Sequence, residues 1–164
     1  MKEYGIPEKI IELVKTLYDD FECAVVENEN TTEWFKIKTG VKQRCNMSGF
    51  LFLMVLDHVM RNTVGNGENG IRWRFNTKLD DLDFADDLSM ISSTKQHLQD
   101  KTTKLKEESE RVGLKINAKE TKVMRLNARN REKITIDNHE IEDVDKFIYL
   151  GATVSINGGG GMRI

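Results

Sequence analysis

The stretch that decides the fold is DDLDFADDLSMIS, residues 80–92. Apolar and polar side chains alternate along it on both sides of the adjacent acids Asp86 and Asp87. A period of two is typical of strands, so the stretch predicts two short strands joined by a tight turn. Both carboxylates are then expected at the tip of a hairpin.

Two neighbouring carboxylates repel each other unless a positive group lies near them. A divalent cation such as Mg²⁺ is a natural partner, because hard cations bind carboxylate oxygens together with water and substrate phosphates. A pair of such ions can activate an attacking hydroxyl and stabilise a leaving pyrophosphate. A solvated acidic turn is the alternative, since Asp80, Asp81 and Asp83 crowd the same stretch.

The segments before this stretch predict two helices and a hairpin. Apolar residues at helical spacing follow Pro7 and predict a helix over residues 7–19. Residues 23–26 and 34–38 are prone to form strands, and the polar residues 27–33 between them predict a hairpin. Ser48 is expected to cap a second, buried helix, whose end is marked by the turn residues 65–67.

The segments after it predict one more helix and several strands. Ser93 or Thr94 is expected to start a charged helix that Gly113 ends. Strand-like segments follow at residues 123–126, 134–136 and 147–150. Residues 1–155 are therefore expected to form one domain, and residues 156–164 an unstructured tail.

Composition limits the class of protein. A chain of 164 residues can bury one core. Its longest apolar run, residues 50–56, is far below the roughly 18 residues that a membrane span needs. The start shows no signal region, and Cys23 and Cys45 lack metal-ligand spacing. We expect an intracellular, reduced protein without a membrane span, a disulfide framework or a zinc site.

Charge is spread unevenly along the chain. Residues 101–133 carry a net charge of +6, whereas the whole chain carries −2, which leaves −8 for the rest. The basic segment predicts either a solvated helix face with a charged loop or a surface that contacts phosphates.

Four ordered motifs carry a family resemblance. They are GVKQRCNMSGFLF at residues 40–52, FADD at 84–87, GLKIN at 113–117 with Thr121-Lys122, and FIYLG at 147–151. In order and spacing they resemble the reverse transcriptase domain of LINE-type (non-LTR) retrotransposons, from residue 4 to about residue 155.

The resemblance implies an α+β fold, a partial right-hand polymerase palm in which an antiparallel sheet is backed by helices, with the start of a thumb. It implies RNA-directed DNA polymerase activity by a two-metal mechanism that uses Mg²⁺ or Mn²⁺. The implied partners are an RNA template, a DNA primer and deoxynucleoside triphosphates. The oligomeric state stays open.

The resemblance also assigns site residues. The catalytic and metal-binding carboxylates are Asp86 and Asp87. The residues expected to contact nucleotide or template are Gln43, Ser48, Phe84, Ala85 and Lys122. The primer grip is expected at Tyr149, Leu150 and Gly151.

Three positions depart from the family pattern. Arg44 replaces a glycine that lets the backbone approach the nucleotide, Glu120 replaces a lysine near the triphosphate, and Gly49 stands where many relatives have proline. The resemblance further implies a third catalytic carboxylate on a strand upstream of residues 7–19, before Met1.

We therefore expect an incomplete palm without polymerase activity of its own, as from a gene-model fragment or a decayed copy. A non-catalytic nucleic-acid-binding protein and an inert retrotransposon remnant are the alternatives.

Overall fold

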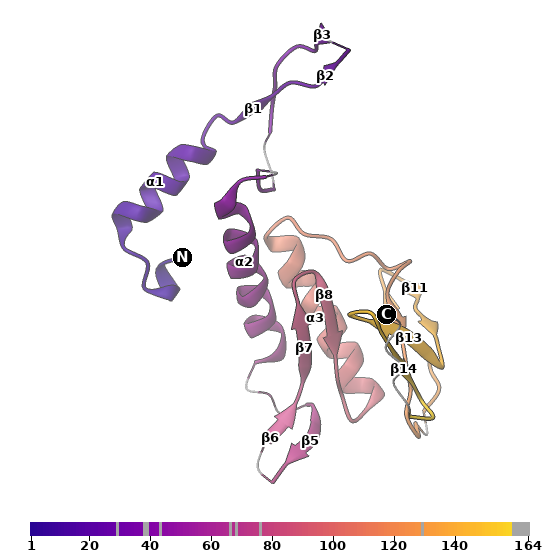
Figure 1. The fold of residues 1–164 in the computed structure, drawn as a ribbon. Coiled ribbons are helices and arrows are strands. Elements are labelled where there is room, and N and C mark those ends of the chain that lie inside the picture. The colour runs from indigo at the N-terminus through magenta and orange to yellow at the C-terminus, as the bar shows by residue number, and fades with distance from the viewer. Residues whose placement is uncertain are drawn as a thin grey trace. The chain divides into compact units, whose positions relative to one another are not determined.

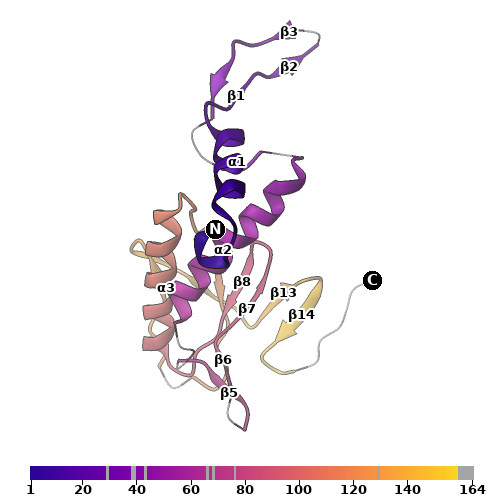
Figure 2. The same cartoon turned by 90° about the vertical axis from the view of Figure 1, so that its left-hand side faces the viewer.

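The computed structural model describes residues 1–28, 30–37, 40–42, 44–65, 67, 69–75, 77–128 and 130–158. The chain forms two compact units, Met1–Met54 and Val55–Ile164. Figures 1 and 2 show the helices and strands of both units. One helix, α2 (Asn46–Val64), contributes its first half to the first unit and its second half to the other.

The first unit begins with a short 3-10 helix, η1 (Lys2–Tyr4), and then α1 (Glu8–Tyr18). Pro7 precedes α1, and the helix buries Ile11 and Val14, so the helix predicted over residues 7–19 is confirmed. The chain leaves α1 through Asp20, which has a positive φ of 49° and forms an ion pair with Lys36 at 2.7 Å.

The predicted hairpin after α1 is also confirmed. Its strands are β1 (Glu22–Cys23), β2 (Val26–Glu27), β3 (Asn30–Thr31) and β4 (Phe35–Lys36). β1 pairs antiparallel with β4, and β2 with β3. The polar connection expected over residues 27–33 therefore contributes a strand, and the turn is shorter than the sequence indicated.

The prediction that Ser48 caps α2 is wrong, because the helix already begins at Asn46. Ser48 lies inside the first turn and is buried. Its hydroxyl donates a hydrogen bond of 2.6 Å to the Lys42 carbonyl oxygen and lies 3.1 Å from the Tyr18 hydroxyl. Ser48 thus joins α1, α2 and the loop before α2.

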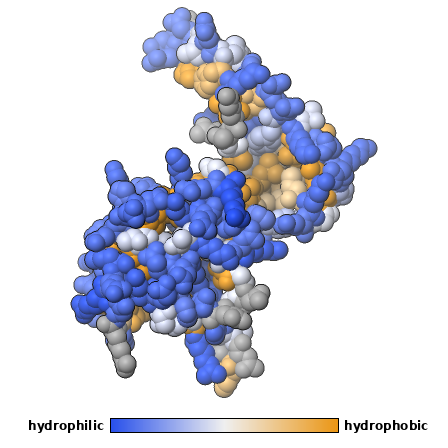
Figure 3. Space-filling model, turned by 180° about the vertical axis from the view of Figure 1, so that it is seen from behind, coloured by the Kyte–Doolittle hydropathy of each residue, from blue (hydrophilic) through white to orange (hydrophobic). Residues whose placement is uncertain are grey.

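Not all apolar residues of the first unit are buried. Ile10, Leu13 and Leu17 of α1 stay exposed, as do Phe50 and Leu53 of α2. Figure 3 shows a mostly hydrophilic surface that such hydrophobic patches interrupt.

The second unit contains two consecutive hairpins that precede a helix. β5 (Ile71–Arg74) pairs with β6 (Thr77–Leu79), and β7 (Asp81–Phe84) pairs with β8 (Asp87–Met90). The hairpin predicted over residues 80–92 is therefore confirmed. Leu88 and Met90 of β8 pack against buried apolar residues of the two flanking helices, namely Val59, Met60 and Leu105.

The helix after these hairpins, α3 (Lys95–Arg111), has the predicted ends. The Thr94 hydroxyl accepts a hydrogen bond from the His97 amide at the start. At the other end, Leu114 N donates to Ser109 O and Gly113 N donates to Glu110 O, with Gly113 at φ 80°. These two bonds form a Schellman motif, for which glycine is favoured.

Short strands complete the second unit. They are β9 (Lys122–Val123), β10 (Thr135–Ile136), β11 (His139–Glu140), β12 (Glu142–Asp143), β13 (Lys146–Tyr149) and β14 (Ala152–Ser155). β9 and β12 pair in parallel, whereas β10 pairs with β11 and β13 with β14 in antiparallel hairpins. A second core lies here, formed by Val123, Ile134, Ile136 and Ile141.

This mixture of helices and small sheets confirms the predicted α+β class. Part of the predicted tail lies outside the described residues, but the Ile156 amide still donates to Asp145 O at 3.0 Å and continues the β13–β14 pairing. Among the described residues, no helix has the length and apolar character of a membrane span.

Candidate active site

The two adjacent carboxylates lie where β7 turns into β8. Phe84 pairs with Asp87, so Ala85 and Asp86 form a two-residue turn. Ala85 has a positive φ of 52°, and a positive φ at the first central residue is the feature of a type II′ hairpin turn. Asp86 and Asp87 are both exposed. The turn therefore leaves both carboxylates accessible to a ligand from solvent.

These side chains offer hard oxygen donors, the donor type that Mg²⁺ and Mn²⁺ prefer. Within the described residues, no group of three His, Cys, Asp or Glu side chains is placed to hold a metal ion. In their donor type, Asp86 and Asp87 are compatible with such a cation, and they would supply two of the ligands that it needs.

A second acidic group lies on the same hairpin, on the face opposite to Leu82 and Phe84. Burial, followed by the charge of the nearby Asp81 carboxylate and a hydrogen bond with it, raises the pKa of Asp83 to about 7. Asp57 of α2 adds a smaller contribution. Alternation along a strand already predicts that Asp81 and Asp83 share one face, but only the strand register reveals that Leu88 and Met90, which pack against the helices, lie on the same face.

The structure brings one of the predicted primer-grip residues to this hairpin. The Tyr149 hydroxyl donates a hydrogen bond of 3.1 Å to the Leu82 carbonyl oxygen of β7. Burial raises the pKa of Tyr149, and the charges of Asp83 and Asp87 raise it further. Tyr149 therefore lies within electrostatic reach of the carboxylates although it is far from them in sequence.

The other two primer-grip residues form the turn between β13 and β14. Leu150 and Gly151 both have positive φ, at 49° and 79°, and Tyr149 pairs with Ala152. Two positive φ angles in a two-residue turn define type I′, which explains the glycine at the second position.

The remaining predicted site residues lie elsewhere. Lys122 belongs to β9 and forms an ion pair with Glu142 of β12. Ser48 belongs to the first unit, and Gln43 lies outside the described residues. Within the second unit, the structure thus gathers Phe84, Ala85, Asp86, Asp87 and Tyr149.

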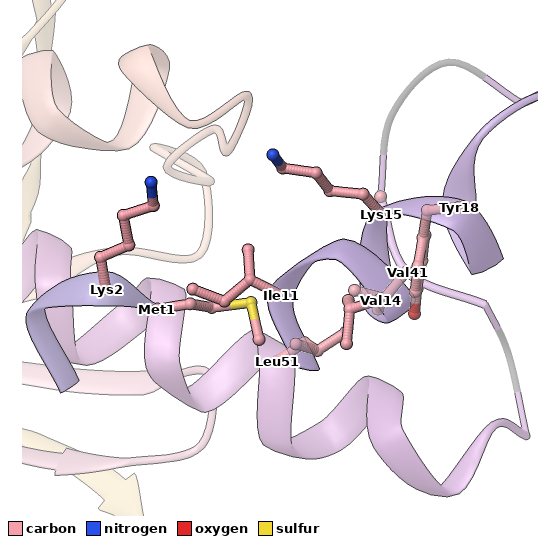
Figure 4. Close-up of a pocket in the computed structure, with 9 residues that line it drawn as sticks. Met1, Lys2, Ile11, Val14, Lys15, Tyr18, Val41 and Leu51 are labelled. Carbon is pink, nitrogen blue, oxygen red and sulfur yellow. The ribbon is translucent and has the colours of Figure 1, made fainter. Parts of the chain in front are cut away.

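A separate hollow of about 440 Å³ lies in the first unit, beside α1 and the start of α2. Figure 4 shows its apolar side chains, with the ammonium ends of Lys2 and Lys15 pointing away from them. Met1, Ile11, Val14 and Leu51 are among the apolar residues that line it. Among the described residues, the lining of the hollow includes none of the predicted site residues and no cluster of polar groups that could bind a substrate.

Comparison with known proteins gives a relative in Drosophila melanogaster. The chain is 25% identical over 169 residues to the retrovirus-related Pol polyprotein from type-2 retrotransposable element R2DM. The match covers 96% of this chain and 16% of the length of that protein. The predicted resemblance to non-LTR reverse transcriptases is therefore confirmed at the level of the family.

The family match itself covers almost the whole chain. The model described as reverse transcriptase (RNA-dependent DNA polymerase) matches residues 1–154. These residues include α1, the hairpin with Asp86 and Asp87, and most of the β13–β14 hairpin. The chain belongs to the reverse transcriptase family.

Proposed function

We propose that this chain is a palm segment of a non-LTR reverse transcriptase, with the start of the thumb in its C-terminal strands. The observation that carries the proposal is the β7–β8 turn, which exposes Asp86 and Asp87 in a chain of this family. The hairpin packs against α2 and α3 through Leu88 and Met90, as expected of a sheet backed by helices.

The reaction proposed is RNA-directed DNA synthesis on an RNA template from a DNA primer. Mg²⁺ or Mn²⁺, when bound, would help the primer 3′-hydroxyl attack a deoxynucleoside triphosphate and would stabilise the leaving pyrophosphate. Asp86 and Asp87 would hold the metal, since the turn leaves both side chains exposed. Phe84 lies on the same turn, beside the expected path of nucleotide and template.

The primer end is proposed to lie near the β13–β14 turn. Tyr149 ties that hairpin to β7 through the Leu82 carbonyl oxygen, so a primer on Leu150 and Gly151 would be kept close to the carboxylates. Gln43, Ser48 and Lys122 are proposed contacts to template or nucleotide by resemblance. The ion pair of Lys122 with Glu142 has to open for that role.

Metal binding tests the proposed site directly. Mn²⁺ should broaden the amide NMR signals of residues 85–88 in the wild-type chain. The effect should disappear in the double variant Asp86→Asn/Asp87→Asn. The matched control is Asp19→Asn/Asp20→Asn, which removes an adjacent pair at the end of α1 and should leave the broadening at residues 85–88 unchanged.

Activity is tested separately by primer extension on an RNA template. We infer that the 164-residue chain alone does not extend the primer, because two adjacent carboxylates do not suffice to hold two ions in line with a nucleotide. Template-dependent incorporation that is lost in Asp86→Asn would show that the chain is competent and that Asp86 is catalytic.

A further inference from the structure

Lys101 is a buried cation in the middle of α3, with 3% of its side chain exposed. Lysine is almost never fully buried unless it is paired. Its ammonium lies 2.5 Å from Asp80 Oδ1, 2.7 Å from the Ile91 carbonyl oxygen and 3.2 Å from the Asp80 carbonyl oxygen. An ammonium has three N–H donors, and three acceptors surround this one.

These acceptors lie at the base of the β7–β8 hairpin. Asp80 directly precedes β7 and Ile91 directly follows β8. The Ile91 amide donates to the Asp80 carbonyl oxygen at 2.7 Å and closes the hairpin there. Lys101 therefore contacts both legs of the hairpin from α3, at the end opposite to Asp86 and Asp87.

The pair is not explained by stability alone. Asp80 Oδ2 is buried and has no hydrogen-bond partner among the described residues. A buried ion pair costs desolvation free energy, and apolar residues of similar volume often replace it without loss of stability. What the pair adds is direction, because hydrogen bonds fix an orientation whereas apolar contacts do not.

The apolar contacts of the hairpin illustrate that difference. Leu88 and Met90 pack against Val59, Met60 and Leu105, which holds the hairpin on the helices. Such contacts tolerate a small sliding of the strands along the helix. The three acceptors around Lys101 instead define where the hairpin lies along α3.

We propose that Lys101 is a positioning residue that sets where the β7–β8 hairpin sits on α3 and thereby where Asp86 and Asp87 are presented. The role of Asp86 and Asp87 in metal binding rests on the proposed function. The position of the hairpin on α3 does not depend on that function, so either proposal can be contradicted without the other.

The test uses the full 164-residue chain and two variants. Lys101→Met removes the ammonium and leaves the Asp80 carboxylate buried and unpaired. The double variant Asp80→Asn/Lys101→Met keeps both volumes without a buried charge, and it decides the question if the single variant does not fold. The matched control is Lys106→Met, on the same helix, whose ion pairs with Asp137 and Glu110 do not involve the hairpin.

Two measurements distinguish positioning from general stability. Native-state hydrogen exchange should show the Ile91 amide exchanging about tenfold faster in the double variant, with the Leu105 amide of α3 unchanged. The Mn²⁺ dissociation constant from broadening at residues 85–88 should also rise, because a hairpin that shifts along α3 presents Asp86 and Asp87 less uniformly. Lys106→Met should match the wild-type chain in both.

Equal acceleration of exchange at Ile91 and Leu105 would overturn the proposal, because Lys101 would then support only the whole unit. Unchanged exchange at Ile91 in the folded double variant would overturn it as well. Absence of Mn²⁺ broadening in the wild-type chain would instead overturn the proposed metal site, and the exchange comparison would still decide the role of Lys101.

Discussion

At the scale of single residues, Asp83 makes stability depend on pH. Its pKa is raised from 3.8 to about 7, first by burial and then by Asp81. The folded chain thus holds this proton more tightly than the unfolded chain. The contribution to stability is fully present below the ordinary pKa and is lost as pH rises through about 7.

Asp83→Asn removes this titration. We expect the variant to have a higher unfolding temperature than the wild-type chain at about pH 8 and a nearly equal one at about pH 4, where wild-type Asp83 is largely protonated. Thermal unfolding followed by circular dichroism measures both. A variant that gains no stability above pH 7 would contradict the assignment of the raised pKa.

Asp143 provides a control, because its pKa is shifted in the opposite direction to that of Asp83. Burial opposes its ionisation, but hydrogen bonds from Lys133 and Arg125 outweigh burial and lower the pKa of this carboxyl. Its stabilising contribution is therefore present above the ordinary value and is lost as pH falls. Asp143→Asn should reduce stability at neutral pH, where Asp83→Asn should raise it.

Arg44 is the residue at which the resemblance expects glycine, and its backbone shows the consequence. Its φ is 59°, in the left-handed region that a β-carbon disfavours. We expect Arg44→Gly to be more stable than Arg44→Ala by about 1–2 kcal/mol, because glycine lacks the β-carbon that makes this left-handed conformation costly.

The control for Arg44 is the exposed Lys104 of α3. There, Ala should be more stable than Gly by about 1 kcal/mol, since glycine is a poor residue inside a helix. Urea unfolding of the four variants gives both differences. The same order of stability at both positions would contradict the left-handed backbone at Arg44.

At the scale of elements, the sequence predicted the β7–β8 hairpin but not the faces of its strands. Even-numbered apolar residues run through both strands, which suggests one shared face. The two-residue turn pairs Phe84 with Asp87 and Asp83 with Leu88, so Leu82 and Leu88 lie on opposite faces. Alternation locates a strand, whereas the length of the turn decides which face meets the core.

Other features depend on contacts between distant segments, which no local pattern contains. Thr94 and Gly113 could be predicted as helix ends because capping uses neighbouring backbone groups. Ser48 has the right residue type for a cap, yet its partners are the Lys42 carbonyl oxygen and Tyr18. The pair of Lys101 and Asp80 could not be predicted either, because Lys101 belongs to a charged segment that is typical of a solvated helix face.

A substitution at Gly70 tests how closely the chain packs at the base of the β5–β6 hairpin. A β-carbon there would overlap the Leu79 carbonyl group and lie 2.7 Å from Asp80 Oδ2. Because backbone atoms cannot move aside cheaply, we expect Gly70→Ala to destabilise the fold by about 1–3 kcal/mol. Chemical denaturation measures this loss.

Gly49 is the matched control, since it lies in α2 with open space around its α-carbon. Gly49→Ala should gain up to about 1 kcal/mol from helix propensity. We therefore expect position 49 to tolerate this substitution. A Gly70→Ala variant as stable as Gly49→Ala would show that the base of the hairpin is looser than described.

At the scale of the whole molecule, ion pairs neutralise much of the basic segment, residues 101–133. At least six of its eleven cations pair with carboxylates: Lys101, Lys106, Arg111, Lys122, Arg125 and Lys133. Several of those carboxylates belong to residues outside the segment, among them Asp80, Asp137, Glu142 and Asp143. The net charge of +6 therefore overstates the positive surface that a phosphate backbone meets.

Binding to RNA or DNA by this chain should accordingly be weak, salt-dependent and indifferent to sequence. Lys115 and Lys119 are exposed and lie beyond the end of α3. Lys115→Glu/Lys119→Glu should lower the affinity for a labelled duplex without changing the unfolding temperature. On a B-form duplex each lost phosphate contact should reduce the slope of log K against log salt by about 0.9.

Lys122→Glu and Arg125→Glu should behave differently, because they place a new carboxylate against Glu142 or Asp143. Arg125 is the more sensitive position, since its guanidinium also donates to the Asn130 and Glu132 carbonyl oxygens. We expect both reversals to lower the unfolding temperature, so a loss of binding in them reports on folding rather than on a contact surface. Submicromolar, sequence-selective affinity that survives the reversals at Lys115 and Lys119 would place the nucleic-acid surface elsewhere on the molecule.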